Sequence, residues 1–154
     1  RMINLNITTL THLTRLFLPG MIERGYGKIL NVASTASFQP GPTMSVYFAT
    51  KAFVLSFSEA VNYEVRKKGV TVTALCPGST ESGFHATALG EGMHVKERKL
   101  PSAREVAEYG YKAMMRGKAV AIPGFKNSIL ASSVRFIPRS LVVKAAGIVQ
   151  EKKY

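Results

Sequence analysis

The sequence has little cysteine and little acid, and each shortage narrows what the protein can be. Its single cysteine, Cys76, excludes an internal disulfide and fits a reducing compartment. Nine acidic residues stand against 21 basic ones, so the net charge is +12. Such a charge attracts anions in general, including phosphates, nucleic acids and anionic lipid surfaces. The charge alone therefore does not choose a partner.

Long apolar runs and a recognisable leader are also missing. No apolar run reaches the roughly 18 residues of a membrane span, and the opening Arg1-Met2-Ile3-Asn4 is not a basic segment followed by an apolar one. Together with the lone cysteine, this predicts a cytoplasmic protein. The three histidines, His12, His85 and His94, have no metal-ligand spacing and no cysteine set beside them. We therefore expect no metal site.

What is present is a globular pattern in which helical and strand periodicities alternate. With 46% hydrophobic residues in 154, the chain can build a core of its own. Because helices and strands alternate, we expect an α/β fold with a parallel sheet and helices on both faces. The expected elements are helices over 2–22, 44–68 and 102–117, strands over 28–33, 70–75 and 119–122, and a basic helical tail interrupted at Pro138.

Three strands make an incomplete sheet of this kind. They cover their flanking helices poorly, and the sequence contains no internal repeat and no second domain. The chain also begins at Arg1, inside a helical pattern. We therefore expect a piece of a longer protein whose earlier strands belong to the same sheet.

Tyr47 and Lys51 are the first candidates for chemistry. They lie four residues apart near the start of a predicted helix, so they share one face. An ammonium beside a phenol stabilises the phenolate and lowers the phenol pKa, which lets the hydroxyl exchange protons with a substrate oxygen. Taken alone the pair is weak evidence, because a surface lysine beside a helical tyrosine arises often by chance.

Ser34 strengthens this interpretation. It follows the predicted strand 28–33 at its carboxyl end, where ligand sites gather in open parallel sheets. Its hydroxyl can donate a hydrogen bond to a carbonyl oxygen and stabilise developing negative charge. The alternative is an ordinary cap or loop serine, and Thr35 and Ser37 carry hydroxyls as well.

Taken together, the motifs resemble the short-chain dehydrogenase/reductase family. The segments are Gly-Lys-Ile-Leu-Asn-Val-Ala-Ser over 27–34, Tyr-Phe-Ala-Thr-Lys-Ala over 47–52 and Val-Thr-Val-Thr-Ala-Leu-Cys-Pro-Gly over 70–78. The family places its catalytic serine some 13 residues before the tyrosine, as Ser34 stands before Tyr47. The resemblance covers about residues 2–84 and weakens beyond them.

The resemblance implies a partial doubly wound parallel sheet of the Rossmann type, of which this chain forms the C-terminal half. It also implies an NAD(P)-dependent oxidoreductase that moves a hydride between a nicotinamide cofactor and a carbonyl or alcohol. In that case Tyr47 is the general acid/base, Lys51 holds the nicotinamide ribose, and Ser34 polarises the substrate carbonyl. The family's fourth residue is an asparagine of the preceding helix, for which Asn6 is preferred over Asn4.

Further positions follow from the same resemblance. Pro77 and Gly78, with Thr80 and Ser82 after them, match the loop that contacts the nicotinamide. Phe84 would touch the substrate. The single domain would then comprise a helix over 1–24, a catalytic core over 27–84, a substrate lid over 85–101 and a C-terminal helix–strand–helix unit over 102–154. An ordinary solvated loop is the alternative for the lid.

The sequence leaves three matters open. The glycine-rich pyrophosphate turn is absent, since Gly25-Tyr26-Gly27 lacks a third glycine and precedes a strand. NAD and NADP therefore cannot be told apart. The alternative function is a truncated or non-catalytic fragment acting as an interaction or dimerisation module. No zinc finger, basic helix or interleaved aromatic sheet motif favours nucleic acid.

Two surfaces have expected partners. The helices over 2–22 and 44–68 carry apolar residues on more than one face, so we expect a homodimer or homotetramer through them. The residues concerned are Leu13, Leu16, Phe17, Phe48, Phe53 and Phe57. We expect the basic, amphipathic tail over 126–154 to pack over the substrate pocket or a neighbouring subunit. The alternative is weak contact with an anionic membrane, which would make the protein membrane-peripheral.

Overall fold

The computed structural model describes residues 1–81 and 100–151, which form one sheet with helices around it. Its order is the alternation of helices and strands expected from the sequence. The elements are η1 (Asn4–Thr9), α1 (Leu10–Glu23), β1 (Gly27–Val32), η2 (Thr35–Phe38), α2 (Ser45–Val65), η3 (Arg66–Lys68), β2 (Val70–Leu75), α4 (Ala103–Met115), β3 (Val120–Ala121), α5 (Phe125–Ser133), η4 (Val134–Phe136) and α6 (Arg139–Glu151).

The sheet is parallel and has the order β1-β2-β3. Gly27 pairs with Val70 at one end of β1 and Val32 pairs with Leu75 at the other, while Ala74 pairs with Val120 of β3. Because β2 lies between the other two strands and under helices, five of its six residues are buried. A β-branched run of this kind is typical of a strand covered on both faces.

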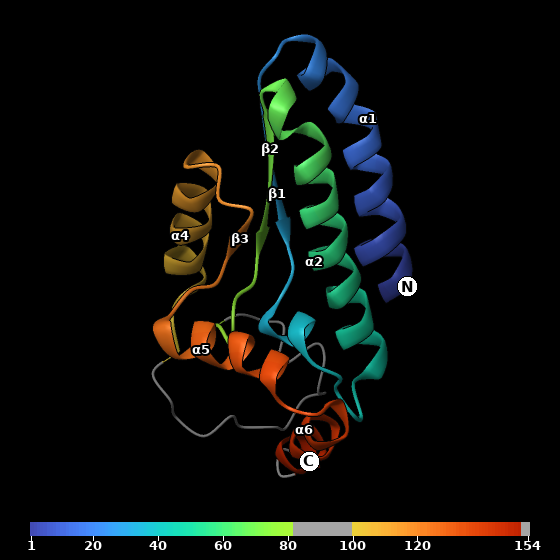
Figure 1. Ribbon diagram of the computed structural model, residues 1–154, viewed down its shortest axis with the longest axis vertical. Helices are drawn as coiled ribbons and strands as arrows, with labels where there is room; N and C mark the ends of the chain where they lie inside the picture. The colour runs from blue at the N-terminus through green and yellow to red at the C-terminus, as the bar shows by residue number, and fades with distance from the viewer. Residues whose placement is uncertain (82–99, 152–154) are drawn as a thin grey trace.

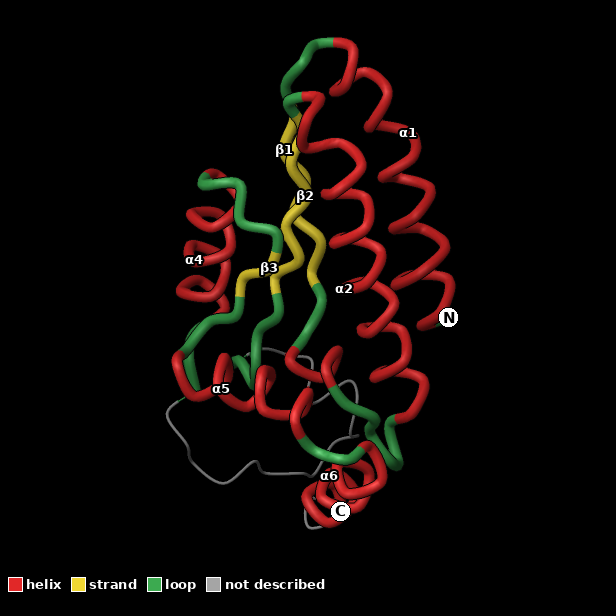
Figure 2. Tube along the Cα trace, in the orientation of Figure 1, coloured by secondary structure: helices red, strands yellow, loops and turns green. Residues whose placement is uncertain are grey.

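Helices cover both faces of the sheet, as Figure 1 shows. The helices α1 and α2 lie side by side over one face, and α4 lies over the other. The helices α5 and α6 lie near the carboxyl ends of the strands, and Figure 2 shows α5 crossing below those ends. The expected α/β, Rossmann-type fold is confirmed.

The core lies between these layers. Val54, Val61 and Val65 of α2 pack toward β2, where Val70 and Val72 are fully buried. On the other face, α4 packs Val106 and Ala113 against Leu75 and Ala121. Each helix therefore buries one apolar stripe against the sheet, so both faces of the sheet are covered.

A tight turn at the amino ends of the strands holds β1 and β2 in register. Gly69 ends η3 with φ of 78°, and a Cβ on it would lie 1.8 Å from the carbonyl oxygen of Gly25. Gly27 donates to the Gly69 carbonyl at 3.3 Å. Only glycine fits such a close approach at a positive φ.

Several element boundaries differ from those expected. The first helix opens as a π-helix over Asn4–Thr9 and continues through Pro19. The long second helix is α-helical only to Val65 and ends in a 3-10 turn. The break at Pro138 is where it was expected, because α6 begins at the next residue.

The basic tail packs by a narrow stripe. In α5 only Ala131 is buried, and in α6 the buried apolar residues are Val142 and Ala146. Phe125 and Phe136, by contrast, are 81% and 87% exposed. None of the helices in the described part of the chain has the length and apolarity needed to span a bilayer. Contact of the tail with an anionic membrane stays a prediction.

Candidate active site

The candidate site lies at the carboxyl ends of β1 and β2. There the pairing of the two strands continues into the loops that follow them. Ala33 donates to the Leu75 carbonyl at 2.7 Å, and Thr35 donates to the Pro77 carbonyl at 2.9 Å. These bonds bring Ser34 beside Pro77. Ligand sites of open parallel sheets form at this edge because the loops of neighbouring strands diverge there.

Ser34 occupies the N-cap of η2. It is 8% exposed, and its Oγ accepts a hydrogen bond from the amide of Ala36 at 3.1 Å. The same hydroxyl donates to the Pro77 carbonyl over 3.5 Å, which is long for an O–H donor. A donor held this weakly can turn toward another acceptor at little cost.

Tyr47 and Lys51 lie on the first two turns of α2, close to η2. Lys51 Nζ is 6.0 Å from the centroid of the Tyr47 ring and donates to the Val32 carbonyl at 2.8 Å. Burial lowers the pKa of Lys51, and the nearby Cys76 opposes that shift because a thiolate there would favour the cation. The Tyr47 ring meets Phe48 edge to face, with centroids 5.9 Å apart.

Cys76 directly follows β2 and is fully buried. Burial raises the pKa of its thiol to about 12, although a hydrogen bond from the Ser34 backbone partly offsets that effect. The thiol is therefore neutral near pH 7 and acts as a small apolar side chain.

Ser37 connects the Ser34 segment to α2. Its hydroxyl donates to the Lys51 carbonyl at 2.7 Å and accepts from the Ser34 amide at 3.3 Å. Sequence reasoning noted Ser37 only as another hydroxyl near Ser34. The available signal was its spacing, because Ser34 and Ser37 form a reciprocal capping box over η2.

Asn6 reaches the same helix from η1. Its Nδ2 donates to Thr50 Oγ1 at 3.0 Å, and Thr50 Oγ1 donates to the Tyr47 carbonyl at 2.8 Å. Thr50 is 1% exposed and had no role in the sequence interpretation. A hydroxyl placed between Tyr47 and Lys51 in a buried helix face was the signal that could have found it.

The loop after β2 contains the remaining candidates. Thr80 Oγ1 donates to the Gly78 carbonyl at 3.1 Å, which folds the loop back after Pro77. A Cβ on Gly78 would lie 2.8 Å from Asn127 Nδ2, so this glycine lets the loop pack against α5. Ser82, Phe84 and most of the expected lid over 85–101 lie outside the described residues.

Two hollows lie near this edge of the sheet. One, of about 340 Å³, is bordered by Ile129, Phe136 and three serines of α5. The other, of about 260 Å³, lies between the loop over 39–42, α2 and Arg139. Neither is lined by Ser34, Tyr47 or Lys51, so both lie apart from the candidate catalytic residues.

The described residues form a Rossmann-type α/β fold with Ser34, Tyr47 and Lys51 near the carboxyl ends of its strands. A family model described as "short chain dehydrogenase" matches residues 1–91. The chain belongs to the short-chain dehydrogenase/reductase family, as the motifs around Ser34, Tyr47 and Gly78 predicted.

Named relatives extend the comparison. The very-long-chain 3-oxoacyl-CoA reductase of Rattus norvegicus is 44% identical over 142 residues, which are 88% of this chain and 44% of that protein. Hydroxysteroid dehydrogenase-like protein 1 of Gallus gallus is 35% identical over 132 residues, or 83% of this chain and 38% of that protein. The chain thus spans less than half the length of these curated relatives.

A solved structure of a short-chain dehydrogenase has a similar fold. The short-chain dehydrogenase from Sphingobium yanoikuyae in complex with NADPH superposes with a TM-score of 0.75 at 30% identity. The match covers 87% of this chain and 52% of that one. The expectation of NAD or NADP as cofactor agrees with the NADPH bound in that neighbour.

One expectation from the sequence is wrong. The opening residues and the single cysteine predicted a cytoplasmic protein, but several matching relatives are very-long-chain 3-oxoacyl-CoA reductases. Each buried CH₂ of an acyl chain is worth about 0.8 kcal/mol, so a substrate of the kind those proteins are named for partitions into membranes. The cysteine count does not report where such a substrate resides.

Proposed function

We propose that the full-length protein is a nicotinamide-dependent reductase that acts on the 3-oxo group of a long acyl thioester. The observation that carries the proposal is that the segment around Ser34 is hydrogen-bonded to Lys51 of α2, through Val32 and Ser37, at the carboxyl edge of the sheet. The substrate class is supported by the 44% identity over 142 residues to a very-long-chain 3-oxoacyl-CoA reductase.

The described residues fit the nicotinamide-ribose end of such a cofactor. Lys51 carries three N–H donors, and among the described residues Val32 is the acceptor found for them. The Tyr47 side chain lies one helical turn before Lys51, and Thr80 adds a hydroxyl from the loop after β2. Lys51 and Tyr47 would hold the ribose hydroxyls, and Thr80 would contact the nicotinamide amide.

When bound, the cofactor supplies the hydride that reaches the carbonyl carbon. Tyr47 gives its hydroxyl proton to the carbonyl oxygen as that bond forms, and the product is the 3-hydroxy thioester. The Lys51 ammonium stabilises the phenolate left on Tyr47. Ser34 turns its hydroxyl from the distant Pro77 carbonyl to the substrate oxygen and stabilises the charge that develops there.

Asn6 supports the site through a neighbour. Its hydrogen bond to Thr50, which in turn bonds the Tyr47 carbonyl, ties η1 to the turn of α2 that carries Tyr47 and Lys51. We infer that Asn6 keeps α1 and α2 aligned at this turn, while Ser82 and Phe84 remain candidates for the cofactor and substrate contacts that the family resemblance implies.

The test is Tyr47→Phe in the full-length protein, assayed with NADPH and a long-chain 3-oxoacyl-CoA. Loss of the proton donor should lower kcat by at least about a hundredfold and leave NADPH binding within about threefold of wild type, since the ring remains. Tyr63→Phe is the matched control, because Tyr63 lies on the same helix but is 70% exposed beside Arg66.

Turnover of Tyr47→Phe at the wild-type rate would disprove the assignment. The alternative, a non-catalytic interaction module, predicts that the wild-type protein oxidises no NADPH with any member of a panel of 3-oxoacyl thioesters and ketosteroids. Turnover of ketosteroids alone would keep the chemistry and replace the substrate class.

We further propose that the protein assembles as a homodimer or homotetramer through α1 and α2. Leu13, Leu16 and Phe17 of α1 are 49%, 71% and 57% exposed, although they are large and apolar. Phe48, included in the expected contact, is instead 7% exposed and packs inward. The exposed apolar residues of the proposed subunit interface therefore lie mainly on α1.

A further inference from the structure

The hydroxyl of Ser37 lies between the two parts of the proposed site. Ser34 belongs to the segment after β1, whereas Tyr47 and Lys51 belong to α2. Ser37 accepts from the Ser34 amide at 3.3 Å and donates to the Lys51 carbonyl at 2.7 Å. A single buried side chain, 9% exposed, therefore bonds directly to the backbone of two proposed catalytic residues.

The Ser34 segment contacts Lys51 at two points. The Lys51 ammonium donates to the Val32 carbonyl, just before Ser34. The Lys51 carbonyl accepts from Ser37, just after it. The Lys51 ammonium is proposed to hold the cofactor. Its hydrogen bond to the Val32 carbonyl must therefore change when the cofactor binds. The Ser37 bond uses only backbone groups of Ser34 and Lys51 and can persist throughout the reaction.

We propose that Ser37 is a positioning residue that sets the distance between the Ser34 hydroxyl and the Tyr47–Lys51 pair. This inference rests on the proposed function. Its physical basis is that a shift of about 1 Å between catalytic groups can cost on the order of a hundredfold in rate. Groups in the proposed site come from two elements, so their spacing needs a link that spans both.

The experiment compares Ser37→Ala with Ser58→Ala in the full-length protein. Ser58 is a matched control because it too is a buried serine that links β1 to α2. It accepts from Asn31 Nδ2 at 2.9 Å and donates to the Val54 carbonyl at 2.7 Å. Ser58 lies about two turns beyond Lys51 along α2, so its loss should leave the proposed site intact.

Both variants should lower the melting temperature, because each loses two hydrogen bonds that are buried or partly buried. Only Ser37→Ala should lower kcat, by between about tenfold and a hundredfold, with KM for NADPH within about twofold. Amide hydrogen exchange gives a readout that does not depend on turnover. Exchange at the Ser34 amide should accelerate in Ser37→Ala and stay at the wild-type rate in Ser58→Ala. Ser37→Thr, which keeps the hydroxyl, should restore slow exchange and most of kcat.

Three results would overturn the inference. They are wild-type kcat in Ser37→Ala, equal losses of kcat in the two alanine variants, and unchanged exchange at Ser34 in Ser37→Ala. Failure of the proposed function is a separate result, since it would appear as full activity of Tyr47→Phe. The exchange measurement at Ser34 would still report whether Ser37 fixes this segment.

Discussion

At the scale of single residues, burial acts on Cys76 and Lys51 in opposite directions. It raises the thiol pKa to about 12, because the thiolate loses hydration. Burial lowers the pKa of Lys51, because the charged ammonium loses hydration as well. Cys76 therefore binds more protons in the folded chain between the ordinary pKa of a thiol and about 12, whereas Lys51 binds more in the unfolded chain between its lowered pKa and its ordinary value of 10.5. Through that window Lys51 adds stability as pH rises.

Cys76 should accordingly be unreactive in the folded protein. At pH 8 to 9 an unfolded thiol is substantially ionised, since its ordinary pKa is about 8.5, but the buried thiol is not. We expect iodoacetamide to modify Cys76 only after denaturation, as measured by mass spectrometry of native and urea-treated samples. Rapid labelling of the native protein at the same pH would show that the thiol is accessible and contradict the burial described here.

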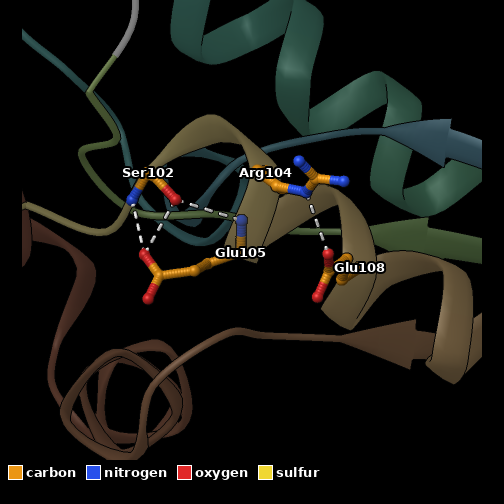
Figure 3. Close-up of polar contacts among 4 residues, drawn as sticks. All are labelled: Ser102, Arg104, Glu105 and Glu108. Atoms are coloured by element: carbon orange, nitrogen blue, oxygen red, sulfur yellow. Dashed lines mark hydrogen bonds and ion pairs between the residues drawn. The ribbon is translucent and has the colours of Figure 1, made fainter.

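At the scale of elements, α4 illustrates how local sequence begins a helix. Figure 3 shows Ser102 and Glu105 in a reciprocal capping box. The amide of Ser102 donates to Glu105 Oε2 at 2.8 Å, and the amide of Glu105 donates to Ser102 Oγ at 3.2 Å. Two amides at the start of α4 thus gain partners. The exposed Arg104–Glu108 pair, 3.2 Å apart, lies one turn along.

Ser102→Ala should destabilise the protein by about 1 kcal/mol, the usual effect of losing an N-cap side chain. Arg104→Ala is the control, since an exposed i,i+4 pair contributes only about 0.3–0.5 kcal/mol. Urea denaturation measures both free energies of unfolding. Equal losses in the two variants would mean that the cap does not anchor α4.

At the scale of the whole molecule, α1 carries an apolar surface that the rest of the described chain leaves open. Leu16 and Phe17 of α1 are more than half exposed, and α1 lies on the side of the sheet opposite α4 (Figure 1). Phe53 and Phe57 of α2 stack 5.6 Å apart and are partly buried. An exposed apolar stripe of this kind favours association with a second copy.

Leu16→Glu together with Phe17→Glu should therefore reduce the mass of the full-length protein to that of a monomer. Light scattering at micromolar concentration measures the change. Phe125→Glu is the matched control, because Phe125 is 81% exposed on α5, at another part of the surface. A monomeric mass for the unmodified protein would refute the assembly, and loss of association in the Phe125 variant would move the interface to α5.

Much of the fold could be predicted from sequence because its signals are local. Helical and strand periodicities placed the elements, and Pro138 marked the break before α6. The spacing of Ser34, Tyr47 and Lys51 indicated the family that the comparisons confirm. The boundaries moved where the helix tightened into a 3-10 turn after Val65 and where it widened into a π-helix over Asn4–Thr9.

The sequence by itself determined the order of the elements, the shared face of Tyr47 and Lys51 and the family, because these depend on residues a few positions apart. Only the tertiary structure decided which hydroxyls join the site. Ser37 meets Lys51 across 14 residues, and Asn6 meets Thr50 across 44. Such bonds form where separate elements pack together, and no local periodicity encodes the distance between two packed elements. The inward packing of Phe48 has the same origin.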